Sequence, residues 1–101
     1  MGDFVLPKRL TSMKLALEAL GLKQLDVYRI AEDNRLVDIV RVKDLTSEKV
    51  VTINLGTVRE SLEVSEFVDR VVSELVRVGV KVDERKLSAL KSKLSIGKRL
   101  S

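Results

Sequence analysis

The sequence predicts an α+β fold: an N-terminal helix, an antiparallel meander of three to four strands, a long amphipathic helix and a short basic C-terminal helix. Two observations predict this order. Apolar residues recur every three or four positions between residues 64 and 78, whereas they recur every second position between residues 25 and 55. No repeat or linker divides the 101 residues, so we expect a single domain, residues 1–101.

Residues 65–79 form the predicted long helix, on which the rest of the chain must pack. Ser65 is a candidate N-cap, and Gly79 supplies a left-handed exit. Because valine and phenylalanine are mediocre helix formers, burial of one broad face must keep this segment helical. That face contains Val64, Phe67, Val68, Val71, Val72, Leu75, Val76 and Val78.

The two other predicted helices flank the chain. The first begins at Pro7 or Thr11 and ends at Gly21. The last begins after the cap residue Asp83 and ends at Gly97. Their apolar faces contain Leu10, Met13, Leu17 and Leu20 in the first helix and Leu87, Leu90 and Leu94 in the last.

Three strands are predicted between the helices. They are Leu25–Glu32, Leu36–Asp44 and Val50–Leu55, with a tight turn at residues 33–35. Because short connections make sequential strands neighbours, we expect an antiparallel meander.

Residues 58–63 are compatible with two structures. Their alternation of apolar and polar residues predicts a fourth strand, after a hairpin turn at Gly56 and Thr57. Alternatively, the long helix begins early, at a capping box formed by Thr57 and Glu60. We favour the strand.

The alternation assigns each strand residue to one of two faces. The face toward the helices contains Leu25, Val27, Leu36, Val40, Val42, Val51, Ile53 and Leu55. The opposite face contains Tyr28, Ile30, Val37, Ile39, Arg41, Lys43, Val50, Thr52 and Asn54. This second face is too apolar to be simply solvated, so another helix or another subunit must cover it. We expect a homodimer or a higher homo-oligomer.

The composition excludes several kinds of site. Cysteine and histidine are absent, which removes disulfides, thiol nucleophiles, zinc thiolate sites and the commonest general base. Ser88 and Lys91 share a predicted helix face, but such pairs often arise by accident, and no glycine-rich phosphate loop is present. We therefore expect a protein that is not an enzyme and that has no cofactor and no metal site.

The composition also indicates a setting. No apolar run approaches the length of a membrane span, and the start MGDFVLPKR has no signal-peptide hydrophobic region, so we expect a cytoplasmic protein without a membrane partner. Few amide residues, no cysteine and many charges are typical of hyperthermophile proteins.

The charge is distributed unevenly. The net charge is +4, and residues 80–101 alone, with seven basic and two acidic side chains, carry +5. Residues 1–24 carry +2, whereas the centre of the chain is slightly acidic. Basic ends predict an anionic partner, although a solubilising tail would have the same composition.

Nucleic acid is the anionic partner that we favour. Lysine and arginine neutralise phosphates without regard to sequence. Base stacking usually needs several exposed aromatic rings, and of the three in this chain only Tyr28 and Phe4 could serve. For the hairpin arginines, cross-strand pairing with Asp26, Asp38 or Asp44 is an equally good explanation. The candidate binding residues are Lys8, Arg9, Tyr28, Arg29, Arg35, Arg41, Lys43, Lys86, Lys91, Lys93, Lys98 and Arg99.

The layout of the whole chain resembles a known family. The segments are the helix KLALEALGL, the meander LDVYRI, VDIVRV and VVTINL, the helix SEFVDRVVSELVRV and the basic helix ERKLSALKSKL. In size and order they resemble the small archaeal single-stranded-DNA-binding proteins of the ThermoDBP-related kind. The resemblance implies helices packed on an antiparallel sheet, without an OB-fold, and a strand held in a basic cleft or between subunits. The resemblance implies single-stranded DNA as the favoured ligand, ahead of RNA, and it assigns no individual residue.

A protein-interaction or oligomerisation module is the alternative function. The second sheet face and the stripe of Leu87, Leu90 and Leu94 could both be docking surfaces, with the basic residues serving only solvation.

Overall fold

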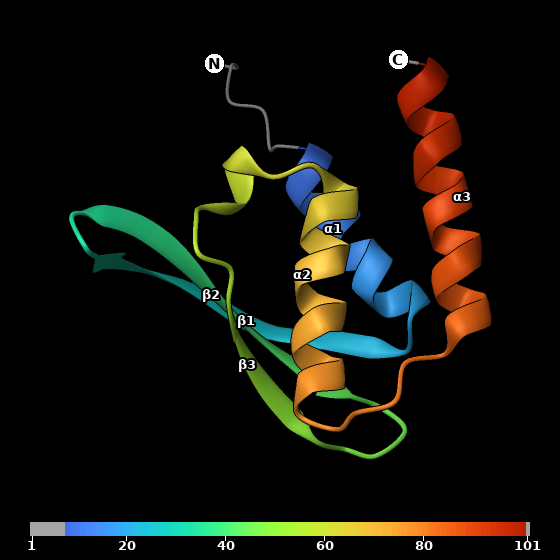
Figure 1. The fold of residues 1–101 in the computed structure, drawn as a ribbon, viewed down its shortest axis with the longest axis horizontal. Coiled ribbons are helices and arrows are strands. Elements are labelled where there is room, and N and C mark those ends of the chain that lie inside the picture. Colours follow the sequence, from blue (N-terminus) through green and yellow to red (C-terminus); the bar gives the residue numbers. More distant parts are fainter. Residues whose placement is uncertain (1–7, 101) are drawn as a thin grey trace.

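The computed structural model describes residues 8–100, with side chains through Leu94, and it confirms the α+β fold with its antiparallel meander. In chain order the elements are α1 (Lys8–Ala19), β1 (Leu22–Glu32), β2 (Arg35–Asp44), β3 (Val50–Asn54), the 3₁₀ turn η1 (Arg59–Ser61), α2 (Val64–Arg77) and α3 (Glu84–Leu100). Figure 1 shows the helices gathered on one side of a sheet whose strand order is β1-β2-β3. None of the described helices is long and apolar enough to cross a membrane.

The hydrophobic core lies between the sheet and helices α1 and α2. In α2, the period of three and four correctly predicted the buried residues Phe67, Val68, Val71 and Leu75. The other fully enclosed core residues come from α1, the sheet and the residue after β3, and include Met13, Leu17, Val40, Val42, Ile53 and Leu55. Helix α3 contacts α1 and α2, so it adds a further layer to the helical side.

The first hairpin is tighter than predicted. Asp33 and Asn34 both have a positive φ, of 51° and 65°, which is the backbone of a two-residue type I′ turn. Arg35, predicted within the turn, therefore lies in β2 opposite Glu32. β1 also begins three residues earlier than predicted, at Leu22 rather than Leu25.

The predicted fourth strand is wrong. Residues 58–63 contain the turn η1, and α2 begins at Val64. Its N-cap is Glu63, which forms a capping box with Glu66, and the Glu63 backbone N–H donates to Glu66 Oε1 at 2.8 Å. Neither the predicted cap Ser65 nor the alternative box at Thr57 starts the helix. Here the Arg59 backbone N–H donates to the side chain of Asp38 in β2 and not to a strand backbone, as detailed below.

The predicted inward face is wrong at two leucines. Leu25 lies in a β-bulge between Gln24 and Asp26, so it leaves the alternation and is exposed. Leu36 is 54% exposed because it lies toward the hairpin tip, outside residues 39–43 of β2, which are the part that β3 pairs with.

The opposite face is less exposed than its sequence predicted. Val37 and Ile39 are buried within the chain itself. The exposed large apolar side chains of this face are Tyr28, Ile30 and Val50. The argument for a covering subunit therefore rests on these three residues, and the dimer stays a prediction.

The last helix begins as predicted and ends later. Asp83 Oδ1 accepts from the backbone N–H groups of Arg85 and Lys86 at 2.9 and 3.1 Å, which confirms the cap. The predicted end at Gly97 is wrong, because α3 continues to Leu100. A helical glycine costs only about 1 kcal/mol, which does not by itself end a helix. The predicted helix start at Pro7 lies outside the described residues.

We expect alanine to have opposite effects at Gly79 and Gly97. Gly79 has a φ of 87°, and a Cβ added there would meet no atom within 4 Å, so alanine meets only backbone strain. It should lower the free energy of unfolding by about 1–2 kcal/mol. At Gly97, inside α3, alanine should raise it by about 0.5 kcal/mol. Urea unfolding measures both changes, and equal losses would contradict the helical assignment of Gly97.

Candidate nucleic-acid interface

Arg29, a candidate for binding nucleic acid, instead holds a buried carboxylate. Asp38 is 1% exposed, and it accepts from Arg29 Nε at 2.7 Å and from Arg29 Nη2 at 3.1 Å. The Nη2 of the same guanidinium also donates to Glu60 Oε1 at 2.7 Å. Because its guanidinium binds two carboxylates of the chain itself, Arg29 stabilises the fold.

Arg59 completes the shell of Asp38. Its backbone N–H and its Nε donate to Asp38 Oδ2 at 2.8 and 3.0 Å. Burial opposes ionisation of Asp38, but the hydrogen bonds from Arg29 and Arg59 outweigh it and hold the pKa of this carboxyl below its ordinary value. The same hydrogen bond to Asp38 raises the pKa of Arg29. This cluster attaches the segment after β3 to the first hairpin.

Three further candidates are engaged in ion pairs. Arg9 Nη1 donates to the backbone oxygens of Glu60 and Leu62 at 3.0 and 3.3 Å, and its Nη2 lies 3.9 Å from Glu63 Oε2. Lys91 on α3 pairs with Asp69 on α2. Arg41 Nη1 donates to Asp26 Oδ2 at 3.0 Å, in an exposed pair across the hairpin. The alternative of cross-strand pairing is thus correct for Arg29 and Arg41.

The remaining basic candidates lie apart from one another. Lys8 lines a small hollow with Arg9 and Glu60, whereas Lys86 lies at the start of α3. Arg35 is exposed at the first hairpin and Lys93 is exposed on α3. The side chains of Lys98 and Arg99, and all of Phe4, lie outside the described residues. Within the described residues, Lys8 and Lys86 therefore line two different hollows.

The outer face of the sheet brings three candidates together. It is the face opposite Val40 and Val42, which pack in the core under the helices. Paired positions across the three strands form successive rows: Lys23, Lys43 and Val50; Asp26, Arg41 and Thr52; Tyr28, Ile39 and Asn54. Tyr28 is 47% exposed, and Arg41 and Lys43 of the neighbouring strand are partly exposed. The Tyr28 ring thus lies one row from Arg41 and Asp26 and two rows from Lys43 on this face.

Lys23 belongs to this face and was missed in the sequence. It pairs with Lys43 near the start of β1, and it is exposed. The predicted first strand began at Leu25, which left Lys23 in a loop. Extending the strand back to the residue after Gly21, which has a φ of 79°, would have identified it.

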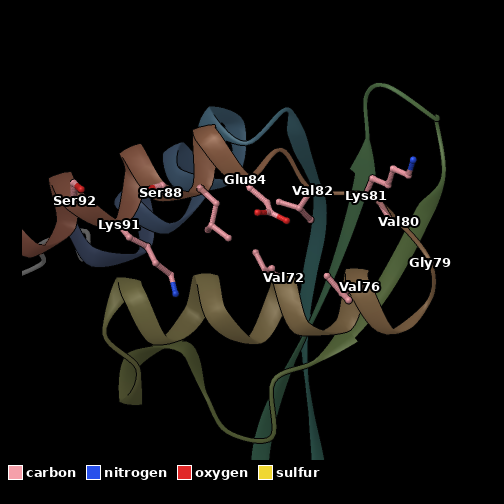
Figure 2. A pocket seen from close by; sticks show the side chains of 11 residues that line it. Val72, Val76, Gly79, Val80, Lys81, Val82, Glu84, Ser88, Lys91 and Ser92 are labelled. Atoms are coloured by element: carbon pink, nitrogen blue, oxygen red, sulfur yellow. The ribbon is translucent and has the colours of Figure 1, made fainter.

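A second surface feature is an apolar groove between α2 and α3, with a volume of about 1040 Å³. Figure 2 shows Val72 and Val76 of α2 facing α3 across it, with Lys91 reaching toward α2. Val76, predicted in the buried stripe, is 61% exposed. The predicted docking stripe of Leu87, Leu90 and Leu94 is partly buried against the core, and Leu87 also lines the groove.

The groove contains the serine and lysine that share a helix face. Ser88 and Lys91 both line it, but the Lys91 ammonium pairs with Asp69, so the structure gives it a carboxylate partner. Among the described residues, no group of three or more acidic side chains is placed to hold a metal ion.

We expect the Asp38 cluster to make stability fall in acid. Because folding lowers the pKa of Asp38, its contribution is complete above the unfolded value of about 3.9 and is lost as the pH falls through the lower folded value. Asp38→Asn should lower the free energy of unfolding at pH 7 by about 3 kcal/mol and remove this part of the acid dependence. Urea unfolding from pH 7 to 2 measures both.

The matched control for this variant is Asp33→Asn, in the exposed turn of the first hairpin, where asparagine tolerates a positive φ equally well. It should leave stability within about 0.5 kcal/mol of wild type. Equal acid sensitivity in wild type and Asp38→Asn would contradict the role of this carboxylate.

Known proteins give no further assignment of this interface. Comparisons with protein family models, curated proteins and solved structures find no match. The resemblance to the ThermoDBP-related proteins therefore stays a prediction from layout. The geometry of the chain's own residues is the basis for its function.

Proposed function

We propose that the outer face of the sheet binds single-stranded nucleic acid, DNA ahead of RNA, with little sequence specificity. One observation carries this proposal: half-exposed Tyr28 lies on a helix-free face with Lys23, Arg41 and Lys43. A ring offers every base a stacking surface, worth about 1–3 kcal/mol per base. The cations neutralise the phosphates that follow the base along the strand.

The shape of the face favours a single strand over a duplex. An open sheet accepts bases that are splayed out and unstacked, whereas a duplex hides the faces of its bases. One ring and three cations make few contacts to base edges, and contacts to phosphates carry no direct sequence information. Low specificity follows from this set of side chains.

The ion pair between Arg41 and Asp26 is compatible with phosphate binding. Both side chains are more than 40% exposed. Exposed pairs of this kind contribute about 0–1 kcal/mol, so a phosphate can replace the Asp26 carboxylate at small cost. Arg29 differs, because its partner Asp38 is buried and would be left unpaired.

We expect Tyr28→Ala to weaken binding of a fluorescent oligo(dT) strand about tenfold, because one stacked base loses its platform. Tyr28→Phe is the matched control and should retain the wild-type dissociation constant, because the ring is preserved. Fluorescence anisotropy at low salt measures both. Equal affinities for wild type and Tyr28→Ala would contradict the proposed stacking.

The basic part of the face has its own test. Lys43→Gln should reduce the slope of log K against log salt by about 0.7, the value for one phosphate contact on a single strand. Lys14→Gln, which removes an exposed charge from α1, should leave the slope unchanged. Equal slopes for the two variants would place the strand elsewhere on the protein.

Sedimentation of the same samples tests the alternative, in which a second copy covers this face. If the wild type is a dimer that Tyr28→Ala dissociates, and the wild type does not bind oligo(dT), the face is an oligomerisation surface and the nucleic-acid proposal is wrong.

A further inference from the structure

A second basic site lies at the end of the sheet where β1 begins and β3 starts. It is a hollow of about 580 Å³, lined by the α1–β1 corner, the β2–β3 connection, the α2–α3 connection and the start of α3. Lys49, Lys81 and Lys86 line it, each from a different segment. All three are exposed, and Figure 2 shows Lys81 beside the β2–β3 connection.

The two acidic side chains that line this hollow, Asp44 and Asp83, accept hydrogen bonds from groups other than the three lysines. Asp44 is buried and accepts from the Ser47 hydroxyl at 2.6 Å and from the Ser47 backbone N–H at 3.2 Å. That hydroxyl, opposed by burial, lowers the pKa of Asp44. Asp83 accepts from the first backbone N–H groups of α3. Within residues 8–94, no ion pair joins any of the three lysines to an acid.

Backbone contacts hold the segments of the hollow together. The Leu45 N–H donates to Gly21 O at 3.1 Å, which joins the β2–β3 connection to the α1–β1 corner. The Lys49 N–H donates to Ser47 Oγ at 3.3 Å. Val80 is buried in the core beside Lys81. These contacts hold the backbone of the β2–β3 connection and of the residue before Lys81 against the fold.

We propose that this hollow binds a phosphate-bearing ligand. Its three ammonium groups offer nine N–H donors, and with Asp44 and Asp83 the lining carries a net charge of +1. The oxygens of a terminal phosphate or a diphosphate can accept from several of these donors at once, and the volume of about 580 Å³ admits either group. This proposal stands on its own residues and does not rest on the sheet-face function.

Inorganic pyrophosphate is the probe that tests the site. Titrated into ¹⁵N-labelled protein at low salt, it should shift the amide resonances of residues 45–49 and 80–86 in a saturable manner. Lys49→Gln/Lys86→Gln should weaken binding at least tenfold. Lys14→Gln/Arg77→Gln removes the same charge elsewhere on the surface and should weaken it less than twofold. Equal weakening by both double variants, or no saturable shift in wild type, would overturn the proposal.

The source of the phosphate is decided by two further titrations. The first compares a 5′-phosphorylated oligo(dT) strand with its 5′-hydroxyl counterpart. If the phosphorylated strand binds more tightly, and Lys49→Gln/Lys86→Gln removes the difference, the ligand is a nucleic-acid end. The second titrates ATP. If ATP binds as tightly as pyrophosphate, and the two oligo(dT) strands bind equally, the ligand is a free nucleotide. Tyr28→Ala should leave pyrophosphate binding unchanged, so failure of the sheet-face function and failure of this site are distinguishable.

Discussion

The buried carboxylate of Asp38 is the constraint on which the rest of the structure depends. A buried charge is costly unless it is paired and hydrogen-bonded, and Asp38 meets both conditions through Arg29 and Arg59. These partners come from β1 and from the segment after β3, so the carboxylate joins three parts of the chain. The segment that could have continued the sheet forms a 3₁₀ turn and then enters α2 at Glu63.

Pairing with carboxylates also separates the cations that stabilise the fold from those that remain free to bind a ligand. Arg29 and Lys91 each have a carboxylate partner on another element, and Arg9 holds the carbonyl oxygens before α2. Lys23 and Lys43 lie on the open face of the sheet instead, where Tyr28 supplies an exposed ring. Apart from Arg41, whose exposed pair with Asp26 is described above, the two proposed sites consist of the second kind of cation. Both sites lie toward the sheet end where Lys43 pairs with Val50, next to Lys49. The net charge of the chain does not distinguish cations that stabilise the fold from cations that are free to bind a ligand.

Local patterns predicted most of the fold and little of the candidate interface. The period of α2, the exit at Gly79 and the cap at Asp83 depend on neighbouring residues, and all three are confirmed. Leu25 was misplaced because a bulge in strand pairing has no local signature. Of the candidate cations, Arg41 and Lys43 share a face with Tyr28, whereas Lys23, Lys49 and Lys81 were missed.

By itself, the sequence determined the fold class, the order of the helices and the first three strands, and the buried centre of the α2 face, because periodicity and capping act over a few residues. It also excluded cysteine and histidine chemistry. Tertiary structure decided which charges meet, because an ion pair such as that of Arg59 with Asp38 spans 21 positions of the chain and depends on how the elements pack. It also decided that Lys49, Lys81 and Lys86, from three separate segments, line one hollow.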